Sequence, residues 1–458
     1  MKFHHVWGAF SRRSNAVLAS CFYDNSLFLA AIGLVLGCTL PVSALAADLT
    51  LESAVAQAQA YDPWLDANRH RESSAVFRFQ GAAELPDPKI SLGLLSLPTD
   101  TFDLNQEAMT QLNVGLSQRF PRGSTLGLSQ KKMEQNTQLQ PVLRQERQAQ
   151  TRLTVTKLWL VALKAQLSIE LITENRRYFE QLRDIATSNY SYLLGGTRQQ
   201  DLIQADVELT QLDDRTTELE RMEQVALAQL MVLMTPVGEA ARAFDAVAGE
   251  LPVVTLDREI GSAPDDVIQA LSVHPAVMAR VRAIEIANTD TDLAKQMFKP
   301  EWAVNTSYGV RGNDAMGRNR ADLISVGVSV DLPLFSSRRQ TSELKAAYSD
   351  LEAVKSERLL VLRELSTRYE SLTADLKALD KRRVLYTDSL LPGLSRSADA
   401  ATNAYGVDNG RFSDVVQARI KALNAKLTAL SLDIERQQTL ANMNYLLTQF
   451  EAVTEQQP

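Results

Sequence analysis

Two pairs of short segments, each with bulky residues at every second position, constrain the fold of this chain more than any other feature of its sequence. The first pair runs from Ile90 to Leu94 and from Leu112 to Leu116, with small or polar residues in between. The second pair, from Trp302 to Tyr308 and from Ile324 to Val330, follows the same rule. A period of two is typical of a strand with one apolar face. The sequence therefore predicts two β-hairpins, with strands at about 89–97, 112–120, 301–310 and 323–332.

The two hairpins belong to a tandem duplication. Pro63 and Pro121 are 58 positions apart, and so are Pro275 and Pro333. The offset between the halves is 212 at these prolines and 213 farther along the chain. One residue of drift over so long a unit favours a repeat over chance. We therefore predict a first repeat at 47–245, a linker at 246–263, a second repeat at 264–452 and a frayed end at 453–458.

Residues 1–46 are typical of an export signal. Basic residues precede an apolar run from Leu27 to Leu40, and Ala44-Leu45-Ala46 fits the small-x-small rule for cleavage. Lipid attachment at Cys38, within a weak lipobox, is the alternative to cleavage after Ala46. The long segment before the apolar run also leaves open a start codon farther downstream. Either form of the signal predicts export from the cytoplasm.

The rest of the chain lacks the residues that catalytic and metal sites use most. Both cysteines, Cys21 and Cys38, lie in the signal, and only His70 and His274 remain as histidines. They fit no metal-ligand spacing, and no Ser-His-Asp set or glycine-rich phosphate loop is present. Because three basic residues and one acidic residue lie in the signal, 45 basic and 54 acidic residues remain, a net charge of about −9. We therefore expect no enzyme activity, no cofactor, no metal and no nucleic-acid partner.

Most of the remaining chain has the pattern of long helices. They are predicted at about 127–194, 197–234, 338–404 and 411–450. Apolar residues from Val155 to Ile172 recur in steps of three and four, as in a coiled coil. At about 1.5 Å per residue, the first of these helices spans about 100 Å, which is far beyond a compact domain. The sequence thus predicts two long antiparallel helical hairpins, one in each repeat.

Four strands with an apolar face cannot lie alone in lipid, because the backbone groups at their edges would be unpaired. Several chains could instead contribute strands to one closed barrel. The length of the strands suits a tilted transmembrane strand, which needs about 9–11 residues. A soluble β-layer packed on the helices is the alternative. The residues predicted to face lipid are Leu112, Val114, Leu116, Ile324, Val326 and Val328.

A motif at the helical turns adds a resemblance to a known family. It has the form Tyr-x-x-Gly-(x)5-Asp-Val/Leu-x-x-Ala, and the first repeat fits it with Tyr192, Gly195, Asp201, Leu202 and Ala205. The second repeat keeps Tyr405, Asp414, Val415 and Ala418, with Asp408 in place of the glycine. We expect Asn409-Gly410 to supply the left-handed turn there. With the export signal, the duplicated hairpins and the long helices, the mature chain resembles the TolC family of outer membrane efflux proteins.

This resemblance implies a mainly α fold with transmembrane β-strands. It implies a homotrimer in the outer membrane, in which three chains close a twelve-stranded β-barrel that continues as an α-barrel through the periplasm. In the family, the helical tip docks onto a periplasmic adaptor, which links to an inner-membrane pump; a pump of the resistance-nodulation-division type is one candidate. The tip residues of this chain are then Leu194, Gly195, Gly196, Thr197, Arg198, Val407, Asp408, Asn409 and Gly410.

The resemblance also implies a gate at the tip, closed by ion pairs and hydrogen bonds between neighbouring helices. Asp201, Tyr405 and Asp414 match gate positions, and Arg411 is displaced by one position from the gate arginine of the family. Helix capping and surface solvation are the alternative roles of these four residues. The expected function is passive conduction through the gated tunnel, with a drug, a metal ion or a secreted protein as cargo. A periplasmic coiled-coil adaptor and an envelope enzyme are the competing classes of protein.

Overall fold

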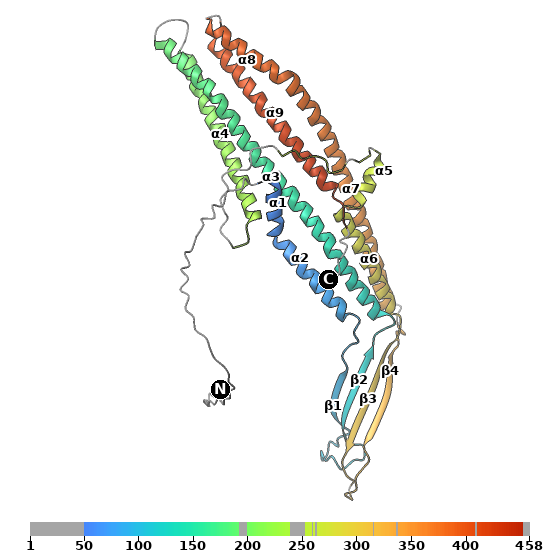
Figure 1. Ribbon diagram of the computed structural model, residues 1–458. Coiled ribbons are helices and arrows are strands. Elements are labelled where there is room, and N and C mark those ends of the chain that lie inside the picture. Colours follow the sequence, from blue (N-terminus) through green and yellow to red (C-terminus); the bar gives the residue numbers. More distant parts are fainter. Residues whose placement is uncertain are drawn as a thin grey trace, which may run out of the picture. The chain divides into compact units, whose positions relative to one another are not determined.

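The computed structural model describes residues 50–191, 199–238, 252–258, 260–261, 263–314, 316–335, 338–407 and 410–451 (Figure 1). They belong to one compact unit, Asp48–Pro458. The predicted export signal lies outside the described residues. Within these ranges, no helix combines the length and the apolar character that crossing a membrane requires.

Long helices and one small sheet make up this unit. The helices are α1 (Leu51–Ala60), α2 (Pro63–Gly81), α3 (Thr125–Ser191), α4 (Gln199–Met234), α5 (Pro264–Ser272), α6 (Pro275–Gln296), α7 (Arg339–Leu385), α8 (Leu391–Gly406) and α9 (Phe412–Leu446). The strands are β1 (Lys89–Leu95), β2 (Gln111–Phe120), β3 (Glu301–Arg311) and β4 (Leu323–Asp331). The predicted combination of long helices with two hairpins is therefore confirmed.

The two hairpins join into a single antiparallel sheet, in the order β1-β2-β3-β4. Its register aligns the alternating residues of all four strands. Val114 lies opposite Leu92 on one side and Tyr308 on the other, and Tyr308 lies opposite Ile324. Because successive side chains of a strand point to opposite faces, this register gathers the bulky residues of both repeats on one face.

The spacing of 212 recurs in the elements. β1 begins at Lys89 and β3 at Glu301, while β2 begins at Gln111 and β4 at Leu323. The helices that precede the hairpins, α2 and α6, both begin at a proline, which has no N–H to leave unpaired in the first turn.

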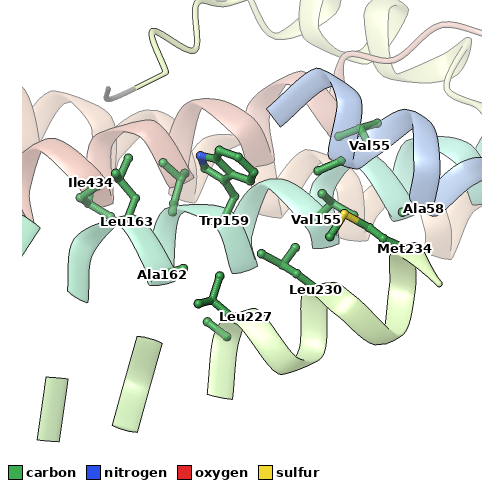
Figure 2. Close-up of a cluster of buried hydrophobic side chains, with 13 residues drawn as sticks. Val55, Ala58, Val155, Trp159, Ala162, Leu163, Leu227, Leu230, Met234 and Ile434 are labelled. Carbon is green, nitrogen blue, oxygen red and sulfur yellow. The ribbon is translucent and has the colours of Figure 1, made fainter. Parts of the chain in front are cut away.

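The core of the helical part lies along α3, where α1, α4 and α9 pack against it. Figure 2 shows Val155 of α3 near Val55 of α1, and Leu163 of α3 beside Ile434 of α9, with Leu230 of α4 in the same cluster. All these side chains are at most 6% exposed. A second cluster lies toward the other end of α3, where Phe179 and Ala186 meet Ala205 of α4 and Phe412 of α9. A continuous apolar stripe on one helix thus holds elements of both repeats together.

The helix predicted at 338–404 is interrupted more strongly than its sequence suggested. Pro392-Gly393 is its obvious flaw, but a π-helical turn, Tyr386–Leu390, precedes the proline and separates α7 from α8. A proline in a helix removes one backbone hydrogen bond and crowds the preceding turn, and a wider turn relieves that crowding. The matching part of the first repeat lies inside α3, where Phe179 is buried.

The N-cap residues of α2 and α6 occupy equivalent positions but differ in chemistry. Asp62 caps α2 by accepting from the Trp64 N–H at 2.9 Å, and Arg147 Nε on α3 donates to its other oxygen at 2.6 Å. Burial would raise the pKa of Asp62, but the hydrogen bonds from Arg147 and Trp64 lower it overall. The first repeat is thus held at this point by a carboxylate that stays ionised at neutral pH.

His274 caps α6 instead, and it is fully buried. Its Nδ1 accepts from the Ala276 N–H at 3.1 Å, so the proton lies on Nε2, which donates to the Tyr445 carbonyl at 3.1 Å. Glu146 of α3 has one oxygen 3.7 Å from Nδ1, and that oxygen has no hydrogen-bond partner among the described residues. Burial lowers the pKa of His274, although the charge of Glu146 acts to raise it.

We predict that His274 makes the fold less stable in acid. The unfolded chain takes up a proton near the ordinary His pKa of about 6.5, whereas the folded chain resists it. The free energy of unfolding should therefore decrease as pH falls below about 6.5, by at most about 1.4 kcal/mol per pH unit. His274→Asn keeps a capping acceptor but cannot take up a proton. This variant should lose less stability than the wild type between pH 7.5 and pH 5.5, as measured by the melting temperature at each pH.

His70 offers a matched control, because its side chain is 81% exposed. His70→Asn should leave the pH dependence of the wild type unchanged. An equal loss of stability in His274→Asn and in the wild type would contradict the assignment.

Candidate functional site

The bulky face of the sheet is exposed. Ile324, Val326 and Val328 of β4 are 74, 73 and 62% exposed, and Leu112, Val114 and Leu116 of β2 are 43 to 44% exposed. In Figure 1 the sheet extends from the ends of the helices, and no labelled helix lies across it. The alternative of a β-layer packed under the chain's own helices is therefore wrong. An apolar face of this size on a soluble monomer would be unusual, so it needs a covering partner.

Aromatic side chains lie near the two ends of this face. Phe120 and Trp302 are neighbours in the register at the end nearest the helices, and Tyr308 lies toward the loops. All three are substantially exposed. Aromatic residues that flank an exposed apolar band are typical of strands that meet the two interfaces of a bilayer.

The opposite face is lined by small and polar residues. Ser91, Asn113, Ser307 and Ser325 lie in a shallow depression of about 340 Å³ on this face. Asn305 Nδ2 donates to Ser329 Oγ at 3.1 Å across β3 and β4. Gly115 of β2 lies between Ser91 and Ser307 in the register, and a Cβ there would come within 2.5 Å of Ser91 Oγ. These short side chains leave room for water beside the sheet.

Charged residues gather on the polar face where the sheet meets the helices. Arg119 Nε lies 3.4 Å from Glu301 Oε1, and Arg122 Nε lies 3.7 Å from Glu301 Oε2. Arg122 also pairs with Asp331 and donates to the Met297 carbonyl at 2.8 Å. Sequence reasoning missed Arg122 and Glu301, although the arginine directly after Phe120-Pro121 was a signal for this contact.

The loops at the other end of the sheet are joined by two arginines. Arg320 Nη1 donates to the Glu107 carbonyl at 3.0 Å, and Arg311 Nη1 donates to the Ala108 carbonyl at 3.2 Å. Both bonds connect the loop of the second hairpin to that of the first. The sheet is therefore fastened at both ends, but β1 and β4 keep open edges.

The four predicted gate residues lie at one end of the helices. Asp201 is in the first turn of α4 and partly buried, and Tyr405 is in the last turn of α8. The ring of Tyr405 packs on Phe412 at 5.8 Å, and its buried hydroxyl has no hydrogen-bond partner among the described residues. Arg411 Nε lies 3.3 Å from Asp414 Oδ2, and both side chains are exposed. The cluster that contains Ala205, Tyr405 and Phe412 brings the two repeats together here.

Most of the predicted tip lies outside the described residues, namely Leu194, Gly195, Gly196, Thr197, Arg198, Asp408 and Asn409. Val407 is described and is 75% exposed. Because Asn409 lies outside the described residues, the left-handed turn expected from Asn409-Gly410 stays a prediction. Gly410 itself is required by close approach, since a Cβ there would lie 2.8 Å from the Tyr405 backbone nitrogen.

No group of three or more His, Cys, Asp or Glu side chains in the described part of the chain is placed to hold a metal ion. The buried polar cluster of His274, Glu146 and Tyr445 is satisfied mainly by backbone and hydroxyl contacts. Within this cluster His274 acts as the cap of α6.

Comparison with known proteins supports the fold. No protein-family model and no curated protein sequence matches the chain. Among solved structures, it is similar to the CusC transmembrane channel (TM-score 0.71, 14% identity, 88% of this chain and 93% of that one). It is also similar to the Campylobacter jejuni CmeC outer membrane channel (TM-score 0.69, 12% identity, 87% of this chain and 86% of that one). For the open state of the Neisseria gonorrhoeae MtrE outer membrane channel the TM-score is 0.67 and the sequence identity 17%, over 87% of this chain and 88% of that one. The TolC-type fold expected from the sequence is thus confirmed.

The contacts of Arg122 predict how much its side chain contributes to the free energy of unfolding. Its side chain is only 17% exposed and holds carbonyl and carboxylate groups of three segments. Arg122→Ala should cost about 1.5–3 kcal/mol of the free energy of unfolding, because the Met297 carbonyl and the partly buried Glu301 carboxylate lose a charged donor. Arg119→Ala, whose side chain is half exposed and also pairs with Glu301, should cost at most about 1 kcal/mol. Urea unfolding followed by tryptophan fluorescence measures both losses of stability, and equal losses would contradict the assignment.

Proposed function

Because the chain has the fold of outer membrane channels, we propose that it is the outer membrane channel of a tripartite efflux or secretion system. It conducts substrate passively from a periplasmic adaptor and an inner-membrane pump to the exterior. The observation that carries this proposal is the four-stranded sheet, which exposes an apolar face on one side and small polar residues on the other. A barrel wall between lipid and water needs these two faces.

The open edges support a homotrimer. In hydrocarbon, the unpaired N–H and C=O groups of β1 and β4 would each cost several kcal/mol, so the edges must pair with further strands. Three copies related by a closed rotation would supply twelve strands, with β4 of one copy beside β1 of the next. The bulky face would then contact lipid, and Asn113, Ser325 and their neighbours would line the bore.

The helices would continue this bore into the periplasm. α3 alone has 67 residues, about 100 Å at about 1.5 Å per residue, which is enough to reach far from the membrane. The proposed adaptor-docking tip lies beyond α3 and α8, at the end where Asp201, Tyr405, Arg411 and Asp414 gather. Contact with the adaptor would favour a dilated packing of the helices over a closed one.

The sheet also separates this proposal from its main alternative. A periplasmic coiled-coil adaptor would need long helical hairpins, but it has no use for a sheet with an exposed apolar face. Fractionation tests the proposal directly. The protein should sediment with the outer membrane, and the purified trimer should form channels in planar lipid bilayers. A monomer recovered from the soluble periplasm would overturn the proposal.

The two faces of β4 give a matched test of lipid contact. Val326→Arg places a charge on the proposed lipid face and should impair trimer assembly by about 2–4 kcal/mol. Ser325→Arg, on the adjacent residue, places the same charge on the proposed bore face, where it stays hydrated. The yield of trimer from outer membranes measures both variants. Equal yields would show that the face assignment is wrong.

The gate assignment predicts a change in conductance. Asp201→Ala or Arg411→Ala should shift the tip toward the open packing. If the substitution lowers the free energy that favours the closed state by about 1 kcal/mol, the ratio of open to closed channels rises about fivefold. Single-channel recordings of the purified trimer measure this shift. Asp206→Ala removes the same charge from an exposed position of α4 and serves as the control. Unchanged closure in both gate variants would count against the assignment.

A further inference from the structure

The segment that joins β4 to α7 has no part in the function proposed above. It consists of Leu332 to Phe335, with Arg338 and Arg339 shortly after. We infer that it is an interfacial anchor for phospholipid. Leu334 and Phe335 insert among the acyl chains of the leaflet nearest the helices, and the two arginines lie at the phosphate groups. The inference rests on the proposed outer membrane placement.

The apolar side chains of this segment are among the most exposed in the described chain. Leu332 is 54% exposed, Leu334 75% and Phe335 92%. The backbone is nevertheless ordered around Pro333, because the Leu334 N–H donates to the Leu332 carbonyl at 2.8 Å. The described part of the chain therefore leaves most of the Leu334 and Phe335 side chains uncovered. Apolar surface of this kind favours a partner outside the chain.

The segment continues the apolar face of the sheet. The alternation of β4 places Leu332 on the same face as Val328 and Val330. From Trp302 to Val310 this face covers eight residue steps, about 26 Å along the strand and about 20 Å across a bilayer at the usual tilt. An outer membrane barrel presents an apolar band of about 25 Å. Leu332, Leu334 and Phe335 extend the band toward the helices by roughly 5–10 Å, which makes up the difference.

The first repeat shows that the hairpin does not require this exposure. The positions equivalent to Leu334 and Phe335 are Arg122 and Gly123. Arg122 turns toward the base of the sheet, where it is 17% exposed. Gly123 has φ of 50°, and a Cβ there would collide with the side chain of Lys299. One repeat therefore closes the junction of strand and helix by internal packing, whereas the other presents apolar side chains outward.

The two arginines supply the charge expected next to lipid head groups. Arg338 and Arg339 are exposed, and neither forms an ion pair with a described residue. The positions equivalent to them in the first repeat are Leu126 and Gly127, so the basic pair is specific to this junction. Apolar side chains followed three residues later in the sequence by arginines match the boundary between acyl chains and phosphates, where arginine keeps its charge in water.

Fluorescence quenching by brominated lipid tests the anchor in the full-length trimer. Without the signal, the tryptophans are Trp64, Trp159 and Trp302, so a Trp302→Phe variant gives the background. Added to that variant, Phe335→Trp should give emission that vesicles of dibrominated phosphatidylcholine and phosphatidylglycerol quench about as strongly as they quench Trp302 in the wild type. Phe77→Trp in the same background is the control, because Phe77 is 69% exposed but belongs to α2. It should show little quenching.

The outcomes separate this inference from the function on which it rests. Quenching of Trp302 in the wild type without quenching in the Phe335→Trp variant would overturn the anchor and leave the proposed channel intact. No quenching of Trp302 would instead contradict the membrane placement itself. Emission of the Phe335→Trp variant that shifts to the blue without lipid quenching would assign the segment to a contact between copies of the chain, and this would also overturn the anchor. Quenching that weakens at least twofold when both arginines are changed to glutamine would support their contact with phosphate.

Discussion

The pairing of backbone groups at the two edges of the sheet is the constraint on which the rest of this structure depends. Within one copy of the chain, β1 and β4 each leave one side of the backbone without a partner strand. Water can satisfy these groups, but hydrocarbon cannot. The apolar face requires hydrocarbon or an equivalent cover, while the edge backbone groups require hydrogen-bond partners. In hydrocarbon, both requirements are met only when further strands close the sheet. The helices have their backbone groups paired internally, so it is the sheet that supports the proposed assembly.

The two repeats keep the same spacing, but they carry different residues at equivalent helix caps, strand ends and helix segments. Asp62 caps α2 with a charged carboxylate, whereas His274 caps α6 with a neutral ring. At equivalent strand ends, the Arg122 side chain is 17% exposed and the Leu334 side chain is 75% exposed. Phe179 lies in the core of an unbroken α3, while the matching part of the second repeat contains a π-helical turn and Pro392. Each pair uses one backbone plan with side chains that differ in charge, size and exposure. Such divergence is what duplication permits once the fold is fixed.

Much of this architecture could be predicted from the sequence, because its strongest signals are periodic. The alternation in Ile324–Val330 predicted both a strand and its exposed face, and the three- and four-residue steps around Val155 predicted a long packed helix. Contacts between distant segments could not be predicted in this way. The pairing of Arg122 with Asp331 and of His274 with Glu146 depends on how α3 lies against other elements, which no local pattern encodes. Gly410 shows the same limit, since the close approach of the Tyr405 backbone depends on packing and not on a local pattern.

The position of Glu146 and Arg147 as consecutive residues of α3 makes the two halves of the duplication inseparable. Arg147 serves the cap of α2, and Glu146 lies against the cap of α6. A second half expressed alone would bury His274 without its carboxylate neighbour, and a first half alone would leave Glu146 facing solvent where α6 and α9 belong. Although the sequence is duplicated, the two halves form one compact unit, and α3 contacts the helix caps of both.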